Sequence, residues 1–200
     1  PKDIDAITLN YTTFLNDLGL KNVIYFHGGL AEYVRMDTRQ LLPINELENI
    51  NLAEFINDEI ASNIDLSSTR VDEQQHVIPS MVPPLKLKPI LSHKYIDTWA
   101  KAAELVHNSK KVVVIGYSFN SADEHFNDII RNSTTRKYDI VAPDVLSEEF
   151  LKRIEKVFGT PLSQFSNTKV QGILAKTTSN VRLIPAKADE VNIEDLFNDD

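Results

Sequence analysis

The chain has 200 residues, of which 42% are apolar, so it can bury one sizeable core within the usual size of a single domain. Its net charge of −8 and pI near 5.1 repel a phosphate backbone or an anionic membrane, so we expect neither nucleic acid nor membrane as a partner. The absence of cysteine excludes disulfides, thiolate zinc sites and thiol nucleophiles, and it favours a reducing cytoplasm. No apolar run approaches the ~20 residues of a membrane span. We expect a cytoplasmic protein whose partner is a small molecule or another protein.

Two apolar, β-branched runs open the chain, at residues 4–9 and 23–26. Each is too short for a helix, and each is continuous rather than alternating, as strands buried on both faces are. The connection from Asn10 to Asn22 is close to the dozen residues that a crossover between parallel strands requires. We therefore expect two strands that pair or lie one apart.

Residues 31–91 interrupt this pattern. An amphipathic helix is predicted around Leu52–Ile64, and it is followed by the polar stretch DLSSTRVDEQQH and by the four prolines of VIPSMVPPLKLKPI. Proline fixes its own backbone and pushes the residue before it toward an extended conformation. We expect a small inserted helical lobe or lid at about residues 31–91, with an extended return.

The rest of the chain alternates strands and helices. Apolar side chains at helical spacing predict helices around residues 96–106, 122–130 and 150–158, and Gly159 ends the last of them. Continuous apolar runs predict strands. These lie at residues 111–115, 138–141 and 181–184. The alternation predicts an α/β fold with a mostly parallel sheet and helices on both faces.

We expect one domain over residues 1–200, with an acidic end at about residues 186–200 that forms a short helix and a solvated tail. The chain opens with Pro1 rather than Met and meets its first strand within a few residues. We therefore expect an excerpt of a longer protein and an incomplete domain.

Polar residues follow the first two predicted strands. In open α/β sheets, ligands bind beyond the carboxyl ends of the strands. Asn10 follows the first run, and His27 with Gly28 and Gly29 follows the second. Taken alone, Asn10 fits a helix cap and His27 fits a partly buried loop histidine. Together, an amide that holds a hydroxyl or a water and an imidazole that takes a proton near neutral pH meet the needs of hydrolysis at a sugar.

A second candidate segment, GYSFNSADEH, begins at Gly116 after the valine-rich run. Ser121 and Glu124 make a capping box that predicts the start of a helix. Asp123 and Glu124 repel phosphate from the first turn, whereas ribose hydroxyls can donate to Asp123. This favours nucleoside recognition with phosphate nearer Gly116 and Ser118. A capped helix without any ligand fits the same residues, and the three-glycine dinucleotide fingerprint is lacking.

The order of these motifs carries a resemblance to a known family. TLNYT, FHGG, the proline-rich IPSMVPPLKLKP, a helix bearing Trp99 and VVVIGYSFNSAD follow one another as they do in the sirtuin-like superfamily. More narrowly, the chain resembles the bacterial sirtuin-like domains of anti-phage defence proteins, from about Ile4 to about Ile130. The resemblance implies a Rossmann-like sheet, a smaller inserted lobe, and NAD as the ligand.

The resemblance also implies roles for single residues. Asn10 is expected to position the attacking water or ribose hydroxyl, and His27 to act as general base in cleavage of the nicotinamide glycosidic bond. No metal is required. The residues expected to hold NAD are Gly28, Gly116, Tyr117, Ser118 and Asp123.

The chain departs from the family pattern at several places. Thr12 stands where an acidic residue commonly follows the Asn-aromatic pair of the family. Phe119-Asn120 stands where Leu-Pro is usual. The Gly-rich turn that normally precedes the Asn strand and holds the pyrophosphate is absent. The lack of cysteine excludes the four-Cys zinc ribbon of the family's protein deacylases, which favours NAD hydrolysis over deacylation.

Three hypotheses stay open. The first is an NAD glycohydrolase that is active in the full-length protein and serves anti-phage defence. The second is a catalytically inactive module that senses a nucleotide or assembles a homo-oligomer. The third is a related abortive-infection family with the same order of motifs. Thr12 and the missing turn favour the second hypothesis, and the coexistence of Asn10 and His27 favours the first.

Overall fold

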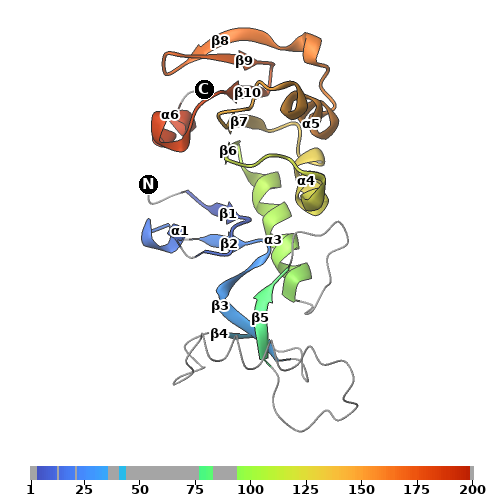
Figure 1. The fold of residues 1–200 in the computed structure, drawn as a ribbon, viewed down its shortest axis with the longest axis vertical. Helices are drawn as coiled ribbons and strands as arrows, with labels where there is room; N and C mark the ends of the chain where they lie inside the picture. Colours follow the sequence, from blue (N-terminus) through green and yellow to red (C-terminus); the bar gives the residue numbers. More distant parts are fainter. Residues whose placement is uncertain are drawn as a thin grey trace. The chain divides into compact units, whose positions relative to one another are not determined.

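The computed structural model describes residues 4–12, 14–20, 22–35, 41–43, 77–82 and 94–198. These residues divide into two compact units, one ending at residue 101 and the other beginning at residue 102 (Figure 1). Helix α3, Lys94–Asn108, contributes its first part to the first unit and the remainder to the second. The prediction of one domain over residues 1–200 stays a prediction.

The first unit contains a parallel strand pair. Strand β1, Ala6–Thr8, pairs with β2, Val23–Tyr25, in the register Ala6 to Val23 through Thr8 to Tyr25. The short helix α1, Phe14–Asp17, lies on the connection between them. The expected pairing of the two strands is confirmed.

A three-stranded antiparallel sheet completes the first unit. Strand β3, Gly28–Arg35, lies between β4, Leu41–Pro43, and β5, Val77–Met81. Strand β5 agrees with the extended return that the prolines predict. The described residues of the expected insertion are therefore strands, and the helix expected around residues 52–64 lies outside the described part of the chain.

The second unit is built on a five-stranded sheet in the order β6-β7-β10-β9-β8. Its first three strands are parallel: β6, Lys111–Ile115; β7, Lys137–Val141; and β10, Val181–Ile184. The other two, β9, Ile173–Thr177, and β8, Ser166–Val170, are antiparallel to their neighbours. The predicted α/β fold is confirmed, with three parallel strands on one side of this sheet.

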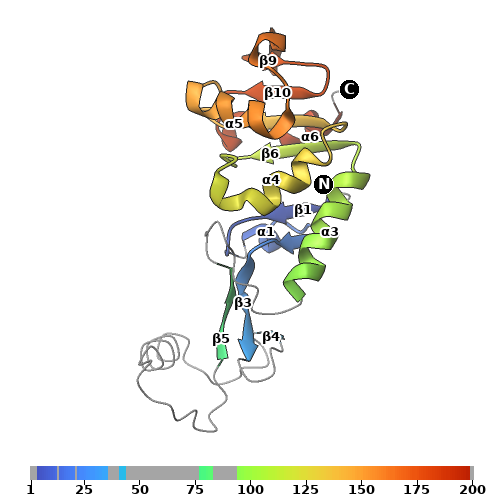
Figure 2. The same cartoon turned by 90° about the vertical axis from the view of Figure 1, so that its right-hand side faces the viewer.

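Helices cover both faces of this sheet. Helices α4, Glu124–Arg131, and α5, Glu148–Phe158, lie on one face, and α6, Ile193–Asn198, lies on the other (Figure 2). Ser147 caps α5 by accepting a hydrogen bond from Phe150 N, and Gly159 ends it with a left-handed φ of 64°. Three short 3₁₀ helices complete the unit: η3, Ser121–Asp123; η4, Leu162–Gln164; and η5, Ala188–Glu190.

Apolar side chains of the acidic end pack on the core, whereas its described acidic side chains are exposed. The predicted short helix is α6, and its Leu196 is fully buried in an apolar cluster with residues that include Val141, Ile184 and Val191. The Lys111 ammonium donates a hydrogen bond to the Leu196 carbonyl, so it binds the carbonyl end of α6 to strand β6. The solvated tail that was expected with this helix stays a prediction, because residues 199–200 lie outside the described part of the chain.

A buried carboxylate joins the three parallel strands. Asp139 on β7 is 1% exposed, and its two oxygens accept hydrogen bonds of 2.6 Å each from the Arg182 guanidinium of β10. The Lys111 ammonium of β6 lies 3.2 Å from the same carboxylate. Two cations therefore surround one anion, as burial of a charged group requires.

Candidate functional site

The parallel pair of the first unit places two predicted catalytic residues at equivalent positions. The last paired residues are Thr8 and Tyr25, and Asn10 and His27 each lie two residues beyond them. Because the strands are parallel, both residues lie beyond the same end of the strand pair. Asn10 and His27 therefore follow the carboxyl ends of adjacent strands, where α/β proteins bind ligands.

Asn10 is exposed, and its backbone N–H donates a hydrogen bond of 3.1 Å to the Thr8 hydroxyl. Helix α1 begins four residues later, at Phe14, so Asn10 is not its N-cap. The simpler of the two interpretations of Asn10, that of a helix cap, does not hold.

The backbone of the turn that carries His27 is fixed on several sides. Phe26 N donates to the Thr8 carbonyl at 2.9 Å, and the Trp99 indole donates to the Phe26 carbonyl at 2.8 Å. Val82 N donates to the His27 carbonyl at 2.8 Å. The turn is therefore attached to β1, to α3 and to the end of β5. Trp99 is a packing residue, because its ring stacks on Phe26 at 5.6 Å.

The imidazole of His27 lies beneath aromatic side chains and is 3% exposed. The Phe26 ring meets it edge-on at 5.1 Å, and the Tyr11 ring lies at 6.5 Å. Tyr11 is itself held, because its hydroxyl donates to the Val82 carbonyl at 2.7 Å. A sugar can reach this imidazole only if the side chains around it move.

Gly28 has a packing role that the sequence did not reveal. Its φ is +74°, and a Cβ at this position would lie 1.9 Å from the Ser80 carbonyl oxygen of β5. Ser80 is buried and forms a 2.8 Å hydrogen bond with the Tyr95 hydroxyl. Only glycine fits this close approach of β3 and β5. Its expected contact with NAD stays a prediction.

The second unit carries the other predicted residues. The segment Gly116–Asn120, here called the β6 loop, leads from β6 into η3. Gly116 is exposed, has a φ of +65°, and has no atom within 4 Å of a Cβ built on it. Its N–H donates to the Val141 carbonyl at 3.0 Å. The loop therefore begins with an open glycine just after the carboxyl end of a parallel strand.

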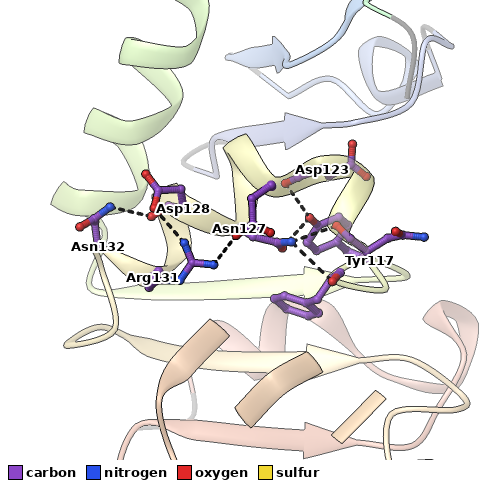
Figure 3. Close-up of polar contacts among 9 residues, drawn as sticks. Tyr117, Asp123, Asn127, Asp128, Arg131 and Asn132 are labelled. Atoms are coloured by element: carbon purple, nitrogen blue, oxygen red, sulfur yellow. Dashed lines mark hydrogen bonds and ion pairs between the residues drawn. The ribbon is translucent and has the colours of Figure 1, made fainter. Parts of the chain in front are cut away.

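Tyr117 points from the β6 loop toward helix α4. Its hydroxyl donates to Asn127 Oδ1 at 2.7 Å and lies 3.5 Å from the Asp123 carbonyl oxygen (Figure 3). Burial raises the pKa of the Tyr117 phenol well above its usual value, and the Asp123 and Glu124 carboxylates raise it further. Tyr117 is therefore a neutral hydrogen-bond donor throughout the physiological pH range.

Phe119 anchors the β6 loop in the core. It is 2% exposed, and its ring lies 4.8 to 6.0 Å from those of Tyr117, Phe150 and Phe158. Its φ of +52° is left-handed, which is uncommon for a residue with a Cβ. Unusual backbone conformations that packing maintains are often found at functional sites.

The start of the following helix differs from the expected capping box. Asn120, not Ser121, caps η3, with its side chain accepting from Ala122 N at 3.1 Å. Glu124 forms a 2.7 Å ion pair with Arg131 instead of returning to the backbone of Ser121. The hydrogen bond from Arg131 is the main cause that lowers the pKa of the Glu124 carboxyl.

Two helix residues that the sequence did not suggest, Asn127 and Arg153, form hydrogen bonds with carbonyl groups of the β6 loop. Arg153 of α5 donates to the Ser118 carbonyl at 3.0 Å. Asn127 of α4 donates to the Asn120 carbonyl at 2.9 Å and lies 3.5 Å from the Phe119 carbonyl oxygen. No local motif marks either residue, because both contacts join elements that the sequence pattern treats separately.

The described residues show neither a metal-binding group nor a membrane-spanning helix. They contain no group of three or more His, Cys, Asp or Glu side chains arranged to hold a metal ion. None of their helices has the length and apolar character that a membrane crossing demands.

No protein-family model matches this chain, and no curated protein matches it. Several solved structures do. A Sir2 enzyme from work on the mechanism and regulation of Sir2 enzymes is 17% identical over 77% of this chain and 61% of that chain, with a TM-score of 0.44. Sir2 in complex with the inhibitor EX-527, 2'-O-acetyl-ADP-ribose and a deacetylated p53 peptide is 21% identical over 69% and 51%, with a TM-score of 0.44. Sir2 with a p53 peptide and NAD+ is 20% identical over 78% and 63%, with a TM-score of 0.43.

This chain spans less than two thirds of the length of each of these three proteins. Because every one of these TM-scores is below 0.5, we base the functional proposals on the chain's own residues. The chain is similar to these sirtuin structures.

Proposed function

We propose that the chain binds NAD or a related nucleotide, with Gly116, Tyr117, Ser118 and Asp123 contacting it. The β6 loop carries this proposal. It follows the carboxyl end of a parallel strand, it opens on an exposed glycine with free space around it, and its conformation is held by α4 and α5. Sites of this kind bind nucleotides in other α/β proteins.

The charges beside the loop favour the nucleoside part of the ligand. Asp123 and Glu124 lie in the first helical turn, where a carboxylate accepts hydrogen bonds from ribose hydroxyls and repels a phosphate. The phosphates belong at the other end of the loop, near Ser118 and near Gly116, where a ligand can approach the glycine backbone closely.

We further propose that the full-length protein hydrolyses NAD at the nicotinamide glycosidic bond. Asn10 holds a water by hydrogen bonds, and His27 accepts a proton from that water as its oxygen attacks the anomeric carbon of the ribose. The carbon–nitrogen bond breaks, its electron pair neutralises the pyridinium nitrogen, and nicotinamide leaves uncharged. The products are nicotinamide, ADP-ribose and one proton. The equivalent positions of Asn10 and His27 beyond the β1–β2 pair support these roles.

The biological setting is a further part of the proposal. The sequence resembles bacterial sirtuin-like domains of anti-phage defence proteins, in which NAD is cleaved at this bond. The lack of cysteine favours hydrolysis over deacylation, because the four-Cys zinc ribbon of the family's deacylases cannot form. Hydrolysis of NAD is the activity that a defence role requires.

One observation favours a second candidate, a module that binds the nucleotide without cleaving it. His27 is 3% exposed, so hydrolysis requires movement of the side chains around it. Binding at the β6 loop requires no such movement, because Gly116 is already exposed. In this second candidate the chain senses a nucleotide, or assembles an oligomer, and His27 serves only the packing of the turn.

Release of nicotinamide from NAD by the full-length protein separates the two candidates. With hydrolysis, His27→Ala lowers the rate by about a hundredfold or more, the usual scale for loss of a general base. The matched control is His107→Ala, which changes an exposed histidine of α3 and leaves the rate unchanged. Asn10→Ala lowers the rate as well, whereas Asn22→Ala, which removes an exposed asparagine that donates to Asp5, does not.

Three outcomes of this assay differ in meaning. Release that depends on His27 supports the hydrolase. NAD binding without release supports the second candidate. A full-length protein that neither binds nor cleaves NAD contradicts both.

A further inference from the structure

Three consecutive carbonyl groups of the β6 loop are directed at side chains of two helices. The Ser118 carbonyl accepts from Arg153 Nη1 at 3.0 Å, and the Asn120 carbonyl accepts from Asn127 Nδ2 at 2.9 Å. The Phe119 carbonyl, between them, lies 3.5 Å from the same nitrogen of Asn127. The Asn120 carbonyl also accepts from Asp123 N at 3.0 Å, the first backbone hydrogen bond of η3, so Asn127 adds to η3 at the end of the loop, and Arg153 holds the Ser118 carbonyl before it.

Asn127 uses its hydrogen-bonding groups on this loop. The residue is 1% exposed, its nitrogen serves the loop carbonyls, and its oxygen accepts from the Tyr117 hydroxyl at 2.7 Å. Figure 3 shows the side chains of Tyr117 and Asn127 pointing toward each other. A buried carboxamide costs free energy unless its polar atoms are paired, and those of Asn127 pair with the loop and also with the Glu124 carboxylate.

Arg153 holds the loop from the second helix. One arm of its guanidinium donates to the Ser118 carbonyl, and the other forms an ion pair with Glu149, four residues earlier in α5. The ion pair keeps the guanidinium in place along the helix surface. A lysine has a single ammonium and cannot make both contacts with the same geometry.

These contacts maintain a backbone conformation that the loop sequence does not favour by itself. Phe119 has a left-handed φ of +52°, which a residue with a Cβ seldom adopts without support. In a trans peptide the N–H of the next residue points opposite to the carbonyl. Fixing the carbonyls of Ser118, Phe119 and Asn120 therefore also fixes the direction of the amides that follow them.

We propose that Asn127 and Arg153 are positioning residues for nucleotide binding: they hold the β6 loop in the conformation that presents Gly116, Ser118 and Asp123 to the ligand. This inference rests on the proposed function, because it deepens the role of the same loop. Neither residue is proposed to touch NAD. Their effect is on the fraction of molecules whose loop is ready to bind.

The test is NAD affinity, measured by titration calorimetry on the whole chain. Asn127→Leu removes every loop contact of the carboxamide with little change in volume, and we expect NAD affinity to fall at least about tenfold. Arg153→Leu weakens binding severalfold, and Arg153→Lys recovers part of the loss because the ammonium can still donate to one carbonyl. If Asn127→Leu does not fold, Arg153→Leu tests the support of the same loop from α5.

The matched control is Tyr138→Phe. Tyr138 is buried, and its hydroxyl donates to the Ser133 carbonyl at 3.2 Å, so this variant also loses a hydrogen bond from a side chain to the backbone, but away from the β6 loop. We expect it to lower stability and to leave NAD affinity unchanged. The titrations are made at a temperature at which Asn127→Leu and Tyr138→Phe are both fully folded. A loss of stability by itself then leaves NAD affinity unchanged.

Amide hydrogen exchange of Ala122 and Asp123, whose N–H groups donate to the side chain and to the carbonyl of Asn120, provides a second readout that does not depend on NAD. Exchange is expected to be at least about tenfold faster in Asn127→Leu and unchanged in Tyr138→Phe. A parent chain that fails to bind NAD contradicts the proposed function, and the positioning role falls with it. A parent that binds NAD, with Asn127→Leu and Arg153→Leu equal to it in affinity and exchange, overturns the positioning role alone.

Discussion

The hydroxyl of Tyr117 donates a 2.7 Å hydrogen bond to the carboxamide of Asn127, ten residues further along the chain. One member of this pair follows from the family resemblance, whereas no sequence signal indicates the other. The contact connects the β6 loop to helix α4 and restricts the conformation of the loop (Figure 3). The conformation of the proposed nucleotide-binding residues therefore depends on residues behind them.

Replacing Gly28 with alanine is expected to lower the free energy of unfolding by about 3 kcal/mol. The new Cβ would lie 1.9 Å from the Ser80 carbonyl oxygen, and φ is +74°. Gly29→Ala is the matched control, because its nearest atom is the Tyr11 carbonyl oxygen at 3.5 Å, an ordinary contact; we expect a change of less than about 1 kcal/mol. Urea unfolding of both variants checks this, and equal midpoints would show that the β3–β5 approach is looser than described.

Gly116→Ala separates a backbone effect from a binding effect. Gly116 and Gly159 have nearly the same φ, 65° and 64°, and no atom lies within 4 Å of a Cβ at either position. Each substitution should therefore cost about 1–2 kcal/mol of stability, the penalty for a Cβ in the left-handed region. Only Gly116→Ala should weaken NAD binding. Equal NAD affinity in the two variants would remove Gly116 from the proposed binding residues.

Asp139→Asn is expected to lower the free energy of unfolding by about 3 kcal/mol, because it leaves the partly buried charges of Arg182 and Lys111 without their carboxylate. Asp128→Asn is the control. Asp128 also pairs with an arginine, but its side chain is 61% exposed, so we expect less than about 1 kcal/mol. Chemical denaturation measures both. A small effect at Asp139 would mean that the β6-β7-β10 ion cluster contributes little to stability.

The phenol of Tyr117 predicts a pH dependence of stability. Its pKa in the folded chain is raised above the usual 10.0, mainly by burial, so the folded state holds this proton more tightly than the unfolded state. The resulting stabilisation is fully present below pH 10 and is lost as pH rises from there toward the raised pKa. Tyr117→Phe should therefore flatten the decline of stability above pH 10. A decline that is unchanged in this variant would assign it to other groups.

Much of the second unit follows from its sequence. The strand at residues 111–115 agrees with β6, and the runs at 138–141 and 181–184 agree with β7 and β10 within one residue. Continuous apolar runs identify these strands because β7 and β10 lie inside the sheet and are largely buried, and β6 pairs with β7 along its whole length. The end of α5 at Gly159 was also predicted correctly, since its signal is local.

The antiparallel strands escaped prediction for a physical reason. In β8, SNTKV, most residues are exposed, and β9 has an exposed leucine at position 174, so neither strand has the apolar pattern of a central strand. The turn between them consists of Gln171 and Gly172, both with positive φ. Asn-Gly would have signalled such a two-residue hairpin, whereas Gln-Gly is a weaker signal.

The candidate site could be predicted only in part. Asn10, His27 and the β6 loop were identified because ligands bind after the carboxyl ends of parallel strands, and that rule needs only the strand pattern. The burial of His27, the contact of Gly28 with Ser80 and the support of the loop by Asn127 depend on contacts between distant segments. Hydrophobic periodicity carries no information on such contacts.

The most direct test of nucleotide binding at the β6 loop is a titration of the isotope-labelled chain with NAD, followed by NMR of the assigned backbone amides. The account predicts saturable shifts centred on Gly116, Ser118 and Asp123, with much smaller shifts at the remote, equally open glycines Gly159 and Gly172. Saturable binding that leaves the residues from 116 to 123 unshifted, or no shift anywhere at millimolar NAD, would contradict it.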